Sequence, residues 1–83
     1  MEIEVRLPQW GMGMQEGEIV TWFKREGEDV QKGDPLVEVE AAKVTDTVVA
    51  PSTGRLIRII AAEGQTVQVR EVLAIIAAED EAV

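Results

Sequence analysis

The sequence predicts an all-β domain, and three observations support this fold class. Over residues 2–7, Ile3, Val5 and Leu7 alternate with charged residues, as in a half-buried strand. Residues 18–24 are rich in β-branched and aromatic side chains, which favour strands, and segments with glycine or proline separate one such run from the next. No stretch combines a sustained helical period with capping residues, so no helix is expected.

The expected strands are short, and each ends at a turn. Pro8 ends the first one, and three glycines make residues 9–17 an irregular loop. After the strand over residues 18–24, two polar turns surround Val30, an isolated apolar residue. The remaining strands are expected over residues 36–40, 44–50, 55–61 and 72–77.

Length and composition limit the size and role of the domain. A chain of 83 residues, 46% hydrophobic and 29% charged, fits one small globular unit. Such a chain buries only about 60% of its unfolded surface, so an enclosed catalytic cavity would compete with the core for apolar side chains. We therefore expect a non-catalytic domain over residues 1–78, followed by a flexible acidic tail or the start of a linker over residues 79–83.

The charge and the missing residue types exclude several functions. The net charge of −8 repels nucleic acids and anionic membranes, so neither is an expected partner. Without Cys or His the usual transition-metal ligand sets cannot form, and no metal site is expected. A reducing cytoplasm fits this composition. The N-terminus lacks the pattern of a secretory signal, and no apolar run is long enough to cross a bilayer.

An internal repeat relates the two halves of the chain. A shift of 37 residues places turns on turns and strands on strands, pairing Gly17 with Gly54, Ile19 with Leu56, Glu26 with Glu63, Gly27 with Gly64, Val30 with Val67, and Leu36 with Leu73. Two such halves would most simply pair as two sheets with a pseudo-twofold relation around one core. The repeat breaks where Gly33 and Pro35 correspond to Arg70 and Val72, so a turn of different chemistry is expected there.

The link between the halves carries Lys43, the strongest candidate for a functional residue. It lies on a tight connection between Ala42 and Val44, with Glu40 and Asp46 nearby. A catalytic lysine needs burial or cationic neighbours to lower its pKa, whereas nearby carboxylates favour its protonated form. Small neighbours would leave the amine accessible to a modifying enzyme. The pattern favours a lysine that carries a group over a catalytic lysine or an ordinary solvated turn residue.

Residues along almost the whole chain carry a resemblance to a known family. They are Leu7-Pro8, Gly11-Met12, Met14, Glu16-Gly17, Ile19-Val20, Trp22, Gly27, Val30, Lys32-Gly33-Asp34, Leu36, Glu38, Glu40, Lys43-Val44-Thr45, Ala50-Pro51 and Gly54. Together they resemble the lipoyl domain of 2-oxo acid dehydrogenase complexes. The resemblance implies a flattened β-barrel, or sandwich, of two four-stranded antiparallel sheets, with the lysine at the tip of a hairpin opposite the termini.

The resemblance also implies a cofactor and partners. It implies lipoic acid in amide linkage to Lys43, with Ala42, Val44 and Glu40 around the attachment site, added by a lipoate ligase or lipoyl transferase. The thiamine-diphosphate-dependent 2-oxo acid dehydrogenase component would reductively acylate the dithiolane of the lipoyl group. The acyltransferase core would pass the acyl group to coenzyme A, and dihydrolipoyl dehydrogenase would reoxidise the dithiol.

Two departures keep alternatives open. Lipoyl domains commonly have an acidic residue before the lysine, where this chain has Ala42, and biotinyl domains have methionine on both sides, where it has Ala42 and Val44. The segment over residues 10–17 and the Thr45 side resemble lipoyl domains more closely. The alternatives are a biotinyl carrier of a carboxylase and an unmodified β-sandwich interaction module.

Further residues near the lysine have two possible roles. Trp10, Met12, Met14 and Glu16 are candidates for contact with a partner enzyme, and packing beneath their loop is the other possibility for the large apolar ones. Glu38 and Glu40 alternate with valines and are expected on the solvated face of a strand.

Overall fold

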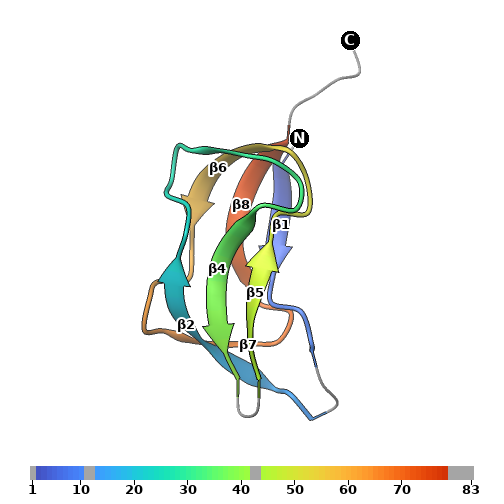
Figure 1. The fold of residues 1–83 in the computed structure, drawn as a ribbon, viewed down its shortest axis with the longest axis vertical. Coiled ribbons are helices and arrows are strands. Elements are labelled where there is room, and N and C mark those ends of the chain that lie inside the picture. Colours follow the sequence, from blue (N-terminus) through green and yellow to red (C-terminus); the bar gives the residue numbers. More distant parts are fainter. Residues whose placement is uncertain (1, 11–12, 42–43, 79–83) are drawn as a thin grey trace.

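The computed structural model describes residues 2–10, 13–41 and 44–78, and this part of the chain forms eight strands and no helix (Figure 1). The strands are β1 Glu2–Arg6, β2 Glu16–Trp22, β3 Asp29–Val30, β4 Pro35–Glu40, β5 Thr45–Val49, β6 Gly54–Ile59, β7 Thr66–Gln68 and β8 Val72–Ala78. The expected all-β class is confirmed. The described part therefore has no helix long and apolar enough to span a membrane. The expected tail over residues 79–83 lies outside the described residues.

Two of these strands are too short for sequence patterns to reveal. Val30, expected as an isolated apolar residue between turns, belongs to β3, which pairs with β6. The segment after the turn around Gly64 forms β7, which pairs with β2. Two or three residues cannot show an alternation, so these strands are defined by their partners rather than by their own composition.

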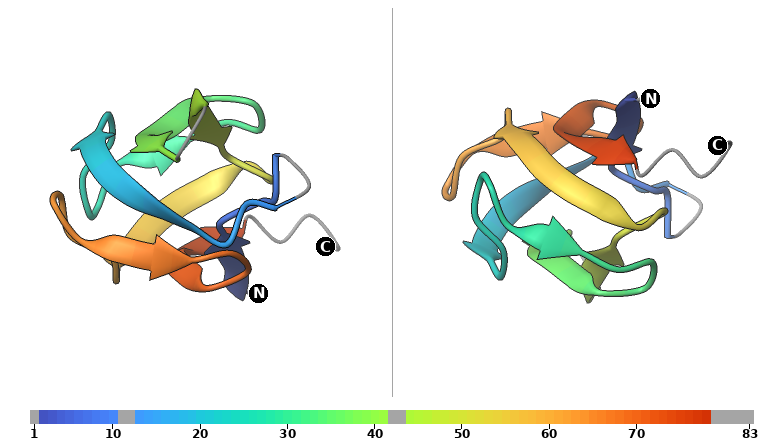
Figure 2. Two further views of the ribbon diagram at one scale, coloured as in Figure 1. Left: turned by 90° about the horizontal axis from the view of Figure 1, so that it is seen from below. Right: turned by 90° about the horizontal axis from the view of Figure 1, so that it is seen from above.

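The eight strands form two antiparallel four-stranded sheets that face each other (Figure 2). One has the order β1-β8-β6-β3 and the other β5-β4-β2-β7. A twofold relation that exchanges β1 with β5, β2 with β6, β3 with β7 and β4 with β8 maps one order onto the other. The expected pseudo-twofold pairing is present, but the halves interleave, since each sheet takes two strands from each half.

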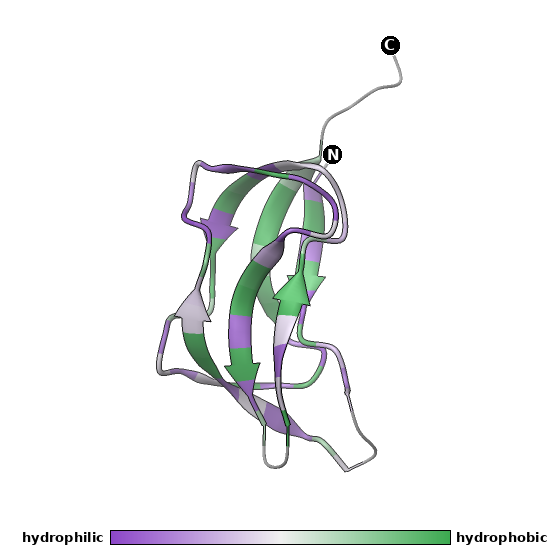
Figure 3. Cartoon of the chain, viewed as in Figure 1, coloured by the Kyte–Doolittle hydropathy of each residue, from purple (hydrophilic) through white to green (hydrophobic). Residues whose placement is uncertain are grey.

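The core lies between the sheets and is entirely apolar among the described residues. Its buried members are Val5, Leu7, Ile19, Val30, Leu36, Val37, Val39, Val48, Ala50, Leu56, Ala61, Val67, Leu73, Ala74 and Ile76. Burial of each large aliphatic side chain stabilises the fold by about 1.5–3 kcal/mol before entropy is counted. On β4, Val37 and Val39 are fully buried, whereas Glu38 is half-buried and Glu40 exposed. Hydrophobic and hydrophilic residues accordingly alternate along this strand (Figure 3). The solvated face expected for these glutamates is confirmed.

Reciprocal hydrogen bonds explain why the repeat includes Glu26 and Glu63. A carboxylate oxygen of Glu26, in the turn after β2, accepts a hydrogen bond of 2.8 Å from the backbone N–H of Ile59 on β6. Glu63, in the turn after β6, accepts one of 2.8 Å from the N–H of Trp22 on β2. Each half thus caps a strand end of the other, which is why both turns keep a glutamate.

The turn expected to differ between the halves differs in its side chain, but both turns have a residue with positive φ at this place. Gly33 has φ 94°, and Arg70, at the corresponding place, has φ 74°. The N–H of Gly33 donates to the carbonyl of Ala50 at 2.9 Å, and the N–H of Arg70 donates to that of Leu7 at 2.8 Å. Arg70 is the only non-glycine residue with positive φ among the described residues.

Trp22, the last residue of β2, and Phe23, which follows it, lie in different environments. Trp22 is half-buried against the core, and its indole N–H donates to the carbonyl of Ala61 at 2.7 Å. Phe23 keeps 45% of its surface exposed.

Candidate functional site

The candidate site is the hairpin of β4 and β5, whose register is fixed up to its last described pair. Glu40 lies opposite Thr45. Beyond them the N–H of Ala41 donates to the carbonyl of Val44 at 2.7 Å, and the N–H of Val44 donates back at 3.4 Å. This pair closes the hairpin, so the connection comprises two residues, Ala42 and Lys43. Two-residue connections are the commonest in β-hairpins.

Ala42 and Lys43 themselves lie outside the described residues, and so does Met12. The role of Lys43 as an attachment site therefore stays a prediction. So does recognition through the flanking Ala42, Val44 and Glu40. Val44, which is described, keeps 38% of its surface exposed.

The closing pair of the hairpin lies at one end of the molecule, and the start of β1 and the end of β8 lie at the other (Figure 1). The strands leading to it are anchored by the core: Val37 and Val39 are fully buried and Val48 keeps only 5% of its surface exposed. β4 also pairs on both sides, with β5 and with β2. A hairpin held this way positions its connection on a rigid support.

Carboxylates gather on the outer face of the sheet beside the hairpin. Glu40 lies opposite Thr45 on β5 and opposite Glu18 on β2, so two like charges face each other directly. Glu38 lies opposite Thr47 on one side and near Thr21 on the other. Among the described residues these glutamates form no ion pair. Like charges directly opposite each other destabilise a sheet, and they give this end a negative field.

The loop from Pro8 to β2 holds the residues that the sequence nominates for partner contact. Trp10 and Met14 are half-buried and pack against the core, and the N–H of Trp10 donates to the Sδ of Met14 at 3.4 Å. Gln9 donates from its side chain to the carbonyl of Met14 at 3.2 Å. Glu16 is exposed at the start of β2. Packing beneath the loop accounts for Trp10 and Met14, and contact with a partner stays a prediction for all of them.

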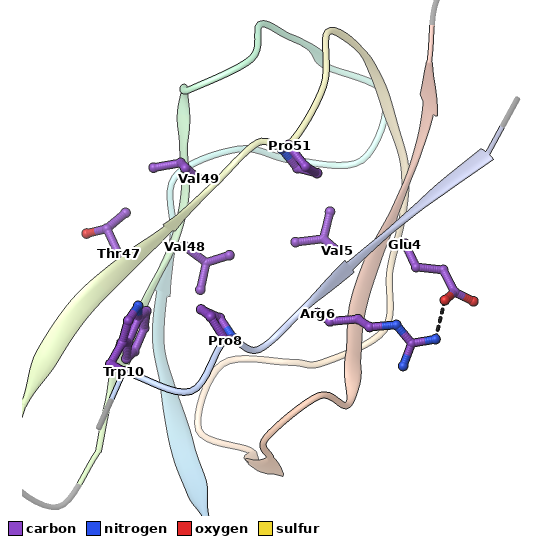
Figure 4. A pocket seen from close by; sticks show the side chains of 9 residues that line it. All are labelled: Glu4, Val5, Arg6, Pro8, Trp10, Thr47, Val48, Val49 and Pro51. Carbon is purple, nitrogen blue, oxygen red and sulfur yellow. Dashed lines mark hydrogen bonds and ion pairs between the residues drawn. The ribbon is translucent and has the colours of Figure 1, made fainter. Parts of the chain in front are cut away.

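A groove that the sequence did not lead us to expect runs between the edge strands β1 and β5 (Figure 4). Its volume is about 290 Å³, and its apolar lining comprises Val5, Pro8, Trp10, Val48, Val49 and Pro51. The sequence does contain a pattern that could have indicated this groove: a shift of 43 residues aligns Val5 with Val48 and Pro8 with Pro51. The walls come from different sheets, so no local pattern shows that they meet.

Comparison with known proteins identifies the family. The family model for biotin-requiring enzymes, which covers biotin and lipoyl attachment domains, matches residues 3–76. The chain belongs to this biotinyl/lipoyl family. A succinyltransferase component of the 2-oxoglutarate dehydrogenase complex from Bartonella vinsonii is 45% identical over 73 residues, which cover 88% of this chain and 18% of that protein. The chain thus spans about a fifth of the length of the curated relatives it matches.

Two solved structures match this fold over most of the chain. The lipoyl domain of the 2-oxoglutarate dehydrogenase complex from Azotobacter vinelandii matches with a TM-score of 0.76 and 29% identity, over 94% of this chain and 99% of that one. A single-chain, multi-domain long-chain acyl-CoA carboxylase matches with a TM-score of 0.79 and 27% identity, over 98% of this chain and 7% of that one. The resemblance to a lipoyl domain and the two four-stranded sheets are confirmed.

Proposed function

We propose that this chain is a lipoyl carrier domain of an acyltransferase component in a 2-oxo acid dehydrogenase-type complex, with lipoic acid in amide linkage to Lys43. The observation that carries the proposal is the hydrogen-bonded pair of Ala41 and Val44, which leaves a two-residue connection containing the lysine at one end of a rigid hairpin. The relatives that match over most of the chain are acyltransferase components of such complexes.

The surroundings of the connection fit an attached arm. Ala41 and Val44, which close the connection, are small or medium in size, and carboxylates lie on the outer face of the strands beside it. When bound, the lipoyl group supplies a dithiolane that accepts an acyl group together with two electrons. The chain itself holds the attachment point on strands whose inner faces are buried, so the arm starts from a fixed position.

A tethered carrier raises the concentration of its cargo at each active site that its tether can reach. The partners of the proposed carrier are the thiamine-diphosphate-dependent dehydrogenase component, the acyltransferase core, dihydrolipoyl dehydrogenase and a lipoate ligase or lipoyl transferase. The carboxylates beside the hairpin, Glu18 and Glu40 among them, favour partners with positively charged docking surfaces. Association with them should weaken as salt is added.

A biotinyl carrier of a carboxylase is the second candidate. It is favoured by the likeness to the acyl-CoA carboxylase chain and by Ala42, which stands where lipoyl domains commonly have an acidic residue.

One experiment separates the candidates. The chain is produced in cells supplied with both lipoate and biotin, and intact mass and peptide mapping identify the group and its position. A lipoyl gain on Lys43, lost in Lys43→Arg and kept in the matched turn variant Lys32→Arg, supports the proposal. A biotinyl gain on Lys43 supports the second candidate. An unmodified Lys43 in the presence of active ligases refutes both and favours an unmodified interaction module.

A further inference from the structure

The groove between β1 and β5 lies at the seam where the two sheets present their unpaired edges (Figure 4). Val5 and Val48 are at its floor, with 2% and 5% of their surfaces exposed. Val49 lies on the wall and keeps 48% exposed. The ionic groups in the lining, Glu4 and Arg6, form an ion pair with each other. Apart from these two residues and Thr47, the side chains that line the groove are apolar, and the groove is open to solvent.

The groove is asymmetric although its walls are related by the pseudo-twofold. The offset of 43 residues matches Val5 with Val48 and Pro8 with Pro51, but it matches Trp10 with Thr53. Only the wall near the hairpin thus has a large aromatic side chain. Trp10 lies there beside Thr47 of β5, and its ring faces the groove (Figure 4). The largest apolar side chain of the groove is thus at the end closest to the closing pair of the hairpin.

The length of a lipoyl-lysine arm is sufficient to reach this surface. Val44, which follows Lys43, is three residues from Thr47, and three residues of extended strand span about 10 Å. From the lysine Cα to the dithiolane ring there are roughly eleven bonds, or about 14 Å at about 1.25 Å of advance per bond. A volume of about 290 Å³ is just below the range of about 300–1,000 Å³ for ligand pockets, so it suits one slender chain and not a folded substrate.

We propose that the groove between β1 and β5 is a resting site for the lipoyl arm, in which the acyl chain of the arm runs along the edge of β5 toward Thr47 and the dithiolane ring contacts Trp10. This inference rests on the proposed lipoylation of Lys43. The arm would exchange between the groove and solvent, because the groove is shallow and its walls leave the chain partly exposed. Docking would shield the ring from solvent between visits to partner enzymes.

The test compares unmodified and lipoylated protein by NMR, after intact mass has shown complete loading at Lys43. We expect nuclear Overhauser contacts between the dithiolane methylene protons and the Trp10 indole. Resonances of Val48 and Val49 should shift on loading, whereas those of Val20 on β2, outside the groove, should not.

A pair of matched variants tests whether the groove causes these effects. Thr47 and Thr21 lie on either side of Glu38, on the outer face of the same sheet, and only Thr47 lines the groove. Thr47→Arg and Thr21→Arg therefore add the same charge beside the same carboxylate. Thr47→Arg should abolish the contacts with Trp10 and at least halve the shifts of Val48, whereas Thr21→Arg should leave both unchanged.

The outcomes separate this inference from the proposed function. Loading without contacts to Trp10, with shifts confined to residues next to the connection, would overturn the resting site and leave the carrier function standing. Equal effects of the two arginine variants would overturn it as well. Failure of a lipoate ligase to load Lys43 would refute the carrier proposal and the resting site together.

Discussion

Replacing Arg70 by glycine should stabilise the domain. Arg70 has φ 74° in the turn between β7 and β8, and its pseudo-twofold counterpart Gly33 has φ 94°. In that region an L side chain crowds its own backbone, at a cost of about 1–2 kcal/mol. The two turns make equivalent backbone hydrogen bonds, to Leu7 and to Ala50, and both bonds persist in the variant because they do not involve side chains.

The expected gain is the relieved strain less the entropy that glycine adds to the unfolded chain. That entropy term is about 0.4–1 kcal/mol, so Arg70→Gly should gain about 0.5–1 kcal/mol net. For a domain of this size, this corresponds to a rise in Tm of about 2–8 °C. The reverse change, Gly33→Arg, should lose a similar amount, because it imposes the same strain on the other half.

Urea denaturation of the four proteins, wild type, Arg70→Gly, Arg70→Ala and Gly33→Arg, measures these differences at constant m-value. The alanine variant is the control, because it removes the exposed side chain while keeping a Cβ in the strained conformation. It should stay within about 0.5 kcal/mol of wild type. If Arg70→Gly is no more stable than Arg70→Ala, the turn does not store the strain that its φ indicates.

The remaining predictions concern the sheets and the lysine. Gly54→Ala should lower the free energy of unfolding by about 3 kcal/mol, because the added Cβ would lie 2.8 Å from the backbone Cα of Ala78. Gly17→Ala should lower it by only about 1–2 kcal/mol, because the nearest atom belongs to a side chain. Equal losses of the two variants in urea denaturation would contradict this reasoning. Glu18→Gln should gain about 0.2–0.5 kcal/mol by removing the repulsion of Glu40, and a gain that persists in 1 M salt would argue against that cause. Lys43→Ala should change stability by less than about 0.5 kcal/mol, and a loss of several would mean that the lysine is structural. Lipoylation of Lys43 should change the net charge from −8 to −9, seen as faster migration toward the anode on native gels, and no shift on loading would mean that its amine is not acylated.

The sequence predicts those parts of the fold that short-range chemistry determines. The alternation of Val37 and Val39 with glutamates identifies β4 and its buried face, because a strand with one solvated side must show that period. The repeat locates Glu26 and Glu63, but only the structure shows that each carboxylate binds the backbone of the opposite half. The interleaving of the halves depends on which strands pair with each other. The sequence of a single strand does not show which strand is its partner.

One part of the candidate site can likewise be predicted from the sequence, and another part cannot. A lysine on a tight connection between two strands is visible from composition, and the hydrogen-bonded pair of Ala41 and Val44 supports the length of that connection. The groove is invisible from composition, because its walls lie 43 residues apart on the edges of different sheets. Trp10 illustrates the difference: the sequence shows a large apolar residue in a loop, and only the fold places it beside Thr47.

The pseudo-twofold also accounts for where the candidate site lies in the molecule. It exchanges β4 with β8 and β5 with β1, so the counterpart of the hairpin pair β4 and β5 is the pair formed by β8 and β1. One pair is joined by the connection that contains Lys43, and the other contains the first and last described strands of the chain. The start of β1 and the end of β8 lie at the opposite end of the molecule from the closing pair of the hairpin (Figure 1), so a segment that continues from either of them would extend from the end remote from the hairpin. A carrier needs this arrangement, since its tether must not obstruct the end that enters partner active sites.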